Sequence, residues 1–177
     1  MDQQKTHQTT KKKENENIEK TLQCGELSVQ FVKDTHNTTS VTNSPMRHYG
    51  RRMKLNCRSG YCLAILPDGT VTSSDDDLNK FCVIEFTSML PGHVRIRGVE
   101  SNLYLAMNKQ SILYGESNPK KKSTIFIEQP QGPYSTFLSF KHQHKNWFVA
   151  IKKNGKIKLG SQTRRGQNST NFLPLMV

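Results

Sequence analysis

A threefold internal repeat restricts the fold of this chain more than any other feature. A short apolar pattern centred on Ala64 recurs around Ala106 and Ala150, at intervals of 42 and 44 residues. In each copy an apolar run leads into a four-residue turn, and another apolar residue follows the turn. A pattern of this kind predicts a β-hairpin. Three copies cannot close a β-propeller, which needs at least about four blades.

The alternation of short apolar runs with turn residues in the repeats predicts the fold class. From Arg52 onward, short runs of apolar and aromatic residues alternate with Pro, Asp, Asn and Gly, which is typical of an all-β protein. Three repeats of about four strands each predict a β-trefoil with about twelve short strands, in which a barrel is capped by three hairpins. Gly69 and Gly155 suit the positive-φ position of the first and third turns, whereas Ser111 stands at that place in the second.

Composition divides the chain into two parts. Residues 1–50 are rich in Gln, Asn, Thr, Ser and Lys, with one strand-like stretch at 27–32, and we expect a mostly disordered polar extension there. Residues 51–177 are expected to form the β-trefoil domain. The first twenty residues lack the apolar core of a signal peptide, so either the chain is processed or recombinant, or export uses another route. No segment approaches the roughly 18 apolar residues that membrane insertion needs.

The charge of the chain is strongly basic and unevenly distributed. Lys and Arg number 26 against 14 for Asp and Glu, which gives a formal net charge of +12. No acidic residue occurs after Glu128, whereas eight basic residues do: Lys141, Lys145, Lys152, Lys153, Lys156, Lys158, Arg164 and Arg165. A face that only kept the protein soluble would mix both signs of charge. The final quarter is therefore predicted to bind a polyanion, with a sulfated polysaccharide as the first choice.

The cysteines do not define a disulfide framework. Cys24, Cys57, Cys62 and Cys82 are few and irregularly spaced for a chain of this length. Their apolar, strand-like neighbours favour buried thiols over disulfides or metal ligands.

No group of residues forms a catalytic or metal-binding constellation, so neither an enzyme nor a cofactor is expected. The acidic run Asp75 to Asp77 suits a solvated turn better than a cation site. His142 and His144 could share one strand face, but the sequence shows no further ligand for a metal. The repeat assigns Trp147 to the core or barrel before base stacking, so no nucleic acid partner is predicted.

Four longer phrases carry a resemblance to a known family. They are LNCRSGYCLAILPDGTV (55–71), VRIRGVESNLYLAMNKQSILYGE (94–116), WFVAIKKNGKIKLG (147–160) and TRRGQNSTNFLPL (163–175). In this order they resemble the fibroblast growth factors, over about residues 50 to 177. The stretches 101–109 and 162–165 are most similar to the keratinocyte growth factor group, whereas 83–86 resembles the glia-activating factor group.

The resemblance implies a secreted, extracellular β-trefoil growth factor without catalytic activity, monomeric by itself. Such a ligand binds heparan sulfate as a co-ligand and the immunoglobulin-like domains of a fibroblast growth factor receptor, a tyrosine kinase, so that two receptors come together and signal. The heparan sulfate or heparin residues that it implies are Ser59, Lys152, Lys153, Asn154, Lys158, Thr163, Gln167 and Asn168. Charge and position add Lys156, Arg164 and Arg165. Asn168 also fits the N-glycosylation pattern, but a glycan there would occupy this site, so we expect it to be unmodified.

The receptor surface of the family maps onto five positions of this chain. They are Asn56, Glu128, Tyr134, Leu173 and Leu175, of which Tyr134 and the two leucines have the character of apolar anchors. Asn56 departs from the family, which usually has an aromatic side chain there. Thr124 stands where a cysteine is usual, and residues 73–77 replace the usual turn. Receptor choice is open at this point.

Two other trefoil classes are alternatives. An intracellular partner protein of the fibroblast growth factor homologous factor type would suit the missing signal peptide, but the ending LGSQTRRGQNSTNFLPL is more similar to secreted, heparin-binding members. A trefoil lectin predicts Gln-x-Trp in each repeat, and the sequence contains none.

Overall fold

The computed structural model describes residues 50–177, which comprise strands and short 3₁₀ helices. The predicted polar extension and its strand-like stretch at 27–32 lie outside the described residues. The strands are β1 (Arg51–Cys57), β2 (Cys62–Ile65), β3 (Val71–Ser74), β4 (Ile84–Leu90), β5 (His93–Gly98), β6 (Tyr104–Met107), β7 (Leu113–Glu116), β8 (Ile125–Gln131), β9 (Tyr134–Ser139) and β10 (Phe172–Met176). The 3₁₀ helices are η1 (Lys80–Cys82), η2 (Lys122–Thr124), η3 (Gln143–Lys145), η4 (Gly160–Gln162) and η5 (Asn168–Thr170). Across the described part of the chain, no helix is long and apolar enough to cross a membrane.

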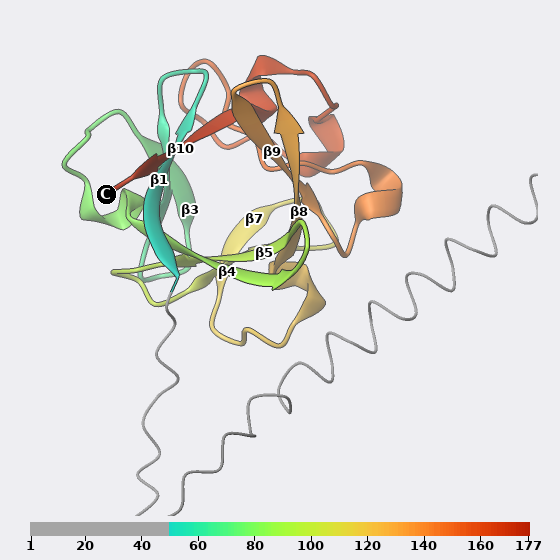
Figure 1. Ribbon diagram of the computed structural model, residues 1–177, viewed down its shortest axis with the longest axis horizontal. Coiled ribbons are helices and arrows are strands. Elements are labelled where there is room, and N and C mark those ends of the chain that lie inside the picture. The colour runs from blue at the N-terminus through green and yellow to red at the C-terminus, as the bar shows by residue number, and fades with distance from the viewer. Residues whose placement is uncertain (1–49) are drawn as a thin grey trace, which may run out of the picture. The chain divides into compact units, whose positions relative to one another are not determined.

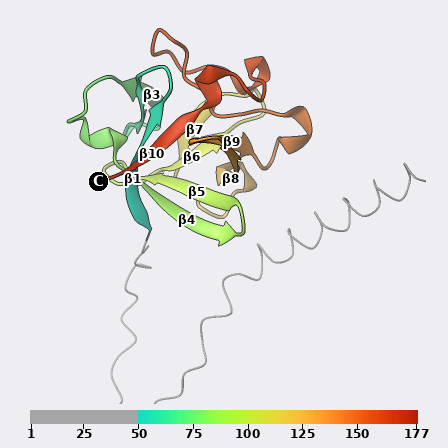
Figure 2. The ribbon, with the colours of Figure 1, turned by 45° about the horizontal axis from the view of Figure 1, so that its top comes forward.

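Six strands form a closed barrel, visible as a ring in Figure 1. Strand β1 pairs with β10 and β4, strand β5 pairs with β4 and β8, and strand β9 pairs with β8 and β10. Each pairing is antiparallel, and Figure 2 shows β10 running beside β1. Closure leaves no open edge in this ring. The predicted all-β trefoil is thereby confirmed.

Hairpins outside the barrel repeat three times, but the third differs from the others. Strands β2 and β3 pair over four residues, as do β6 and β7. In the third hairpin Ile151 and Ile157 form an isolated bridge. Beyond Lys158 the N–H of Gly160 donates to the carbonyl of Ser111 at 2.8 Å, as the N–H of Gly115 donates to the carbonyl of Gly69 in the second repeat. The described residues therefore hold ten strands where the sequence predicted about twelve.

The three hairpin turns have the same backbone geometry despite different sequences. The N–H of Gly69, Ser111 and Gly155 donates to the carbonyl three residues earlier, at 3.0, 3.1 and 2.9 Å. All three residues have positive φ, of 84°, 64° and 78°. Ser111 tolerates this conformation in a buried position, where its hydroxyl donates to Ser161 Oγ at 2.9 Å. The serine turn that looked least typical in the sequence therefore keeps the threefold pattern.

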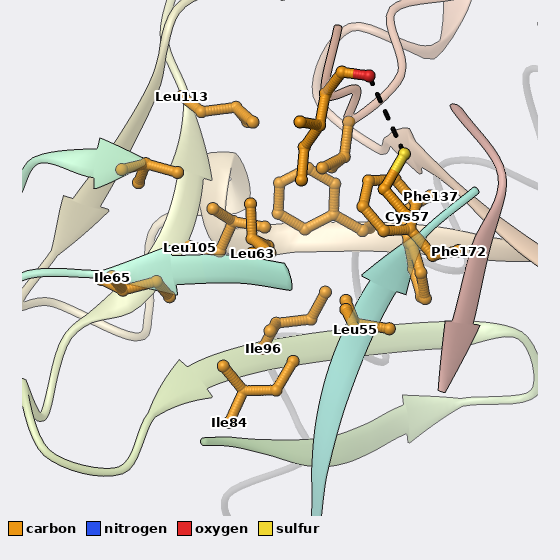
Figure 3. Packing of buried hydrophobic residues seen from close by; sticks show 14 of the residues in the cluster. Leu55, Cys57, Leu63, Ile65, Ile84, Ile96, Leu105, Leu113, Phe137 and Phe172 are labelled. Atoms are coloured by element: carbon orange, nitrogen blue, oxygen red, sulfur yellow. Dashed lines mark hydrogen bonds between the residues drawn. The ribbon is translucent and has the colours of Figure 1, made fainter. Parts of the chain in front are cut away.

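The core lies between the barrel and the hairpins. Apolar side chains of the barrel strands, among them Leu55, Ile96 and Phe137, meet Leu63 and Leu105 from the hairpins (Figure 3). Each of these five side chains is fully buried. The repeat-centre residues Ala64, Ala106 and Ala150 are also fully buried, as their assignment to close packing predicted.

Candidate functional site

The third-repeat hairpin is held in place at its tip. Gly155 lies against Tyr61 so closely that a Cβ there would come within 2.8 Å of the Tyr61 ring. The hydroxyl of Ser73 donates to the carbonyl of Gly155. Within the turn, Asn154 Oδ1 accepts from the N–H of Lys156 at 3.3 Å. The first repeat therefore fixes the direction in which the third-repeat lysines project.

The loop that follows the hairpin is joined to it by one side-chain amide. Lys158 Nζ, on the hairpin, donates to Gln167 Oε1 at 2.9 Å. The same oxygen accepts from the N–H of Arg164 at 3.3 Å. A second connection is the hydrogen bond that the N–H of Ile151 donates to the carbonyl of Ser169 at 2.9 Å. Hairpin and loop, which are consecutive in the sequence, thus form one surface.

This surface, which we call the basic surface, carries cations from a part of the sequence that contains no acidic residue. Lys152, Lys153, Lys156, Arg164 and Arg165 are exposed, and Lys158 is half-buried. Asn154 and Asn168 are exposed beside them, and Gln167 is half-buried. The ion pairs of Lys80 with Glu100, Arg97 with Glu85 and Lys121 with Glu116 all lie outside the basic surface. Its positive charge is therefore not neutralised by carboxylates of the third repeat.

Thr163 differs from the other residues assigned to this surface. It is buried, its hydroxyl donates to the carbonyl of Gly160 at 2.6 Å, and it accepts from the N–H of Phe148 at 2.9 Å. With its single proton used inside the protein, the hydroxyl has none to donate to a ligand. We therefore correct its expected role from ligand contact to support of the loop.

Ser59 lies on a turn that packs beside the same loop. The N–H of Arg58 donates to the carbonyl of Asn171 at 2.9 Å, and the thiol of Cys57 lies 3.5 Å from the carbonyl of Ser169. Ser59 Oγ itself is buried and has no hydrogen-bond partner. The turn is thus adjacent to the end of the loop, as the resemblance implied, but the Ser59 hydroxyl is turned away from solvent.

The residues assigned to a receptor lie on neighbouring barrel strands. Asn56 on β1 is directly opposite Leu173 on β10, and the pairing of Phe172 with Ser135 places Tyr134 of β9 opposite Leu173 on its other side. Leu173 and Leu175 are 37% and 41% exposed, so neither is a core residue. We call Asn56, Tyr134, Leu173 and Leu175 the apolar row. Asn56 Oδ1 is buried without a partner, so this position offers no aromatic contact.

Glu128 connects to this row through a neighbour. On β8 it lies opposite Phe137, and its Oε1 accepts from Ser135 Oγ at 2.6 Å. Because Ser135 directly follows Tyr134, the carboxylate is held beside the row, although it is not within it. The half-buried Glu128 is thereby oriented before any partner arrives.

Arg58 is a candidate residue that sequence reasoning missed. Its guanidinium lies 5.5 Å from the centre of the Tyr134 ring, a favourable cation–π distance. Arg58 is exposed on the turn after β1. Only the barrel brings this turn beside β9, so no spacing in the sequence indicated the contact.

Comparison with known proteins identifies the family of this chain. The family profile described as FGF, Fibroblast growth factor, matches residues 51–173. The chain belongs to the fibroblast growth factor family. Fibroblast growth factors are growth factors and not enzymes, and they require no cofactor. The matched region contains the whole basic surface and most of the apolar row.

Three fibroblast growth factors of amphibians resemble the chain over most of their length. Fibroblast growth factor 1 of Cynops pyrrhogaster is 39% identical over 140 residues, which is 78% of this chain and 95% of the relative. The protein of the same name from Xenopus laevis is 36% identical, with 77% and 89% covered. That of Notophthalmus viridescens is 39% identical, with 67% and 89% covered. All three relatives are named fibroblast growth factor 1, so they do not support the expected similarity to the keratinocyte growth factor group.

Proposed function

We propose that this fibroblast growth factor is a secreted ligand that binds heparan sulfate through its basic surface and a receptor tyrosine kinase through its apolar row. Bound together on one polysaccharide chain, two such ligand–receptor pairs would dimerise the receptor and start signalling in proliferation, differentiation or migration. The observation that carries this proposal is the hydrogen bond between Lys158 and Gln167, which makes one cationic surface from hairpin and loop.

The chemistry of the basic surface fits a sulfated chain. Arg164 and Arg165 can each hold a sulfate through two parallel hydrogen bonds, whereas lysines contribute movable point charges. Asn154 and Asn168 add exposed amide donors. Each exposed contact contributes little by itself, so affinity grows with the number of contacts and falls as salt is added. A repetitive polyanion satisfies this requirement better than a single small anion.

The apolar row fits a protein partner. Leu173, Leu175, Met176 and Val177 are exposed apolar residues at the end of the chain. Tyr134, under the Arg58 guanidinium, adds an aromatic group of the kind enriched in binding hot spots. Because β1, β10 and β9 are adjacent barrel strands, these groups are rigidly placed, which lowers the entropy lost on binding.

A paired chromatography experiment tests the polysaccharide half of the proposal. We expect the intact protein to elute from heparin at higher salt than from a cation exchanger of equal charge density. The reason is that a fixed arrangement of donors recognises sulfates beyond net charge. Elution at the same salt from both columns would reduce the basic surface to unspecific charge and contradict the proposal.

A cell assay tests the receptor half. Cells that display a fibroblast growth factor receptor but lack heparan sulfate should show receptor phosphorylation only when protein and heparin are added together. Phosphorylation without heparin would separate receptor activation from the basic surface. No phosphorylation with any receptor isoform would favour the homologous-factor type of trefoil, which acts inside cells.

A further inference from the structure

The thiols of Cys62 and Cys82 lie in one buried cluster of the first repeat, and Cys62 pairs with Asn56 of the apolar row across β1 and β2. Cys62 begins β2 and Cys82 ends η1, and the two belong to one small buried cluster with Ala64 and Phe81. Their exposed fractions are 4% and 0%. Cys82 Sγ lies 3.9 Å from the carbonyl of Cys62, and Cys62 Sγ lies 3.9 Å from the carbonyl of Leu63.

The threefold repeat shows how unusual this arrangement is within the molecule. The positions equivalent to Cys62 hold Tyr104 and Phe148, and those equivalent to Cys82 hold Thr124 and Thr170. The Thr124 hydroxyl donates to the Lys121 carbonyl at 2.7 Å, and that of Thr170 donates to the Gln167 carbonyl at 2.8 Å. Both threonines thus bond back to their own 3₁₀ turn. In the first repeat the Cys82 thiol lies instead near a carbonyl of another strand, that of Cys62 on β2.

We infer that Cys62 and Cys82 are a modification site at which a small-molecule disulfide, such as oxidised glutathione, converts two buried thiols into an intramolecular disulfide. The inference stands independently of polysaccharide and receptor binding. Cys57, Cys62 and Cys82 are free and buried in the structure, as the sequence predicted for them, and the inference adds a reaction that two of these thiols can undergo.

The surroundings identify Cys82 as the attacking group. The neighbouring Cys62 thiol holds the pKa of Cys82 below its ordinary value, and the Lys54 ammonium acts in the same direction, while burial opposes them. The neighbouring Cys82 thiol, together with burial, raises the pKa of Cys62. A thiolate is the reactive form of cysteine, so the first attack comes from Cys82 and the resolving attack from Cys62.

The two steps balance as ordinary thiol–disulfide exchange. The Cys82 thiolate attacks one sulfur of oxidised glutathione, whose disulfide bond breaks, and one glutathione leaves as thiolate and takes up a proton. Cys62 then loses its proton to solvent and attacks the Cys82 sulfur, which expels the second glutathione. Two protein thiols are oxidised, and one glutathione disulfide is reduced to two glutathione molecules.

Access to the buried pair leads through the turn between β3 and η1. Asp75 to Leu78 are exposed, with Leu78 at 91%. Asn79 Oδ1 accepts from the N–H of Phe81 at 3.0 Å and caps η1. The exchange requires this short capped turn to open far enough to expose Cys82, by local unfolding. The new bond would then tie η1 to β2 and close the segment that contains the acidic turn.

Peptide mapping of the full chain tests the inference. Native, reduced protein is incubated with oxidised glutathione, free thiols are alkylated, and the protein is digested with trypsin without reduction. Cleavage after Arg58, Lys80 and Arg95 places Cys62 in residues 59–80 and Cys82 in residues 81–95. We expect these two peptides as one cross-linked species, about 2 Da below the sum of the free peptides. Alkylation of both cysteines, or a bond from either to Cys57 or to another chain, would overturn the inference.

Two further measurements separate a specific pair from general reactivity. Cys57 contacts backbone carbonyls of the third repeat, so a Cys57→Ala variant should still give the cross-linked peptide. A Cys62→Ala variant should instead retain glutathione on Cys82. Oxidised wild-type protein should also unfold several degrees above the reduced protein. An unchanged unfolding temperature would contradict a bond that ties η1 to β2, and it would do so even if the variants failed to fold.

Discussion

Lys158 Nζ and Gln167 Oε1 are 2.9 Å apart, in a hydrogen bond that joins the third hairpin to the loop after it. The same oxygen also accepts from Arg164 N. One neutral side chain therefore holds the ammonium of Lys158 close to the backbone of Arg164, although the two residues carry like charges. The basic surface depends on this amide as well as on its cations.

Replacing Gln167 with Met removes the acceptor and keeps the size of the side chain. We expect a loss of about 1 kcal/mol in the free energy of unfolding and several-fold weaker heparin binding, because the loop is no longer tied to the hairpin. Titration calorimetry and thermal unfolding measure the two effects. Gln162→Met, at an exposed position of the same loop, is the control, and equal effects of both variants would contradict the role of Gln167.

Reversing two charges of the basic surface should weaken heparin binding with little effect on folding. In Lys158→Glu/Arg164→Glu the polyanion meets two repulsive groups, while the Gln167 amide can turn to donate to the carboxylate introduced on the hairpin. The control Arg51→Glu/Lys109→Glu makes the same change in net charge at exposed residues of the other two repeats. Elution salt on heparin should fall clearly more for the first pair, and a similar fall for both would indicate that only net charge matters.

Gly155 should be the least replaceable glycine of the third repeat. An Ala side chain there would need a positive φ of 78° and would approach the Tyr61 ring to 2.8 Å. We expect Gly155→Ala to cost about 3 kcal/mol of unfolding free energy. Gly132→Ala also needs positive φ, but no atom lies within 4 Å of its Cβ, so about 1 kcal/mol is expected. Denaturant unfolding measures both variants. Equal losses of unfolding free energy would show that the Tyr61 ring moves aside without cost.

Much of the fold was readable from the sequence because the repeat signal comes from short-range patterns. Ala64, Ala106 and Ala150 marked three hairpins, and their spacing alone led to the trefoil that the structure shows. The number of strands was overestimated because the third hairpin pairs fully only at Ile151 and Ile157. Because residues 149–157 share the apolar pattern of the other two hairpins, no local pattern distinguishes this shorter pairing.

The candidate surfaces were predictable in composition and less so in detail. Charge alone pointed to the lysines and arginines of the third repeat, and the resemblance supplied the rest. Neither indicated that the Thr163 hydroxyl is used inside the loop or that Arg58 covers Tyr134. Both facts depend on which distant segments the closed barrel brings together.

The stability of the protein should fall below neutral pH partly because of His142. Burial, followed by the charge of Lys141, holds the pKa of His142 below its ordinary value of 6.5, and Lys145 and His144 act in the same direction. Its ring packs 4.8 Å from the Trp147 ring. Below about pH 6.5 the unfolded chain binds the proton more readily than the folded chain, so stability is lost as pH falls.

Replacing His142 with Gln should therefore flatten the loss of stability between pH 7 and about pH 5. The exposed His144 provides the control, and His144→Gln should keep the wild-type slope. Thermal unfolding across this pH range measures both variants. A slope that is unchanged by His142→Gln would assign the acid sensitivity to other groups.

Leu173 and Leu159 allow a matched test of the apolar row, because they are exposed to nearly the same extent, 37% and 39%. Leu173 lies between Asn56 and Tyr134 on adjacent strands, whereas Leu159 follows the third hairpin. A receptor domain that covers the row would bury the Leu173 side chain, so Leu173→Ala should weaken binding to the receptor ectodomain about tenfold, equivalent to about 1.4 kcal/mol. Surface plasmon resonance with saturating heparin measures this. Leu159→Ala should bind like the wild type, and the reverse order of the two variants would move the receptor surface from the barrel strands to the third repeat.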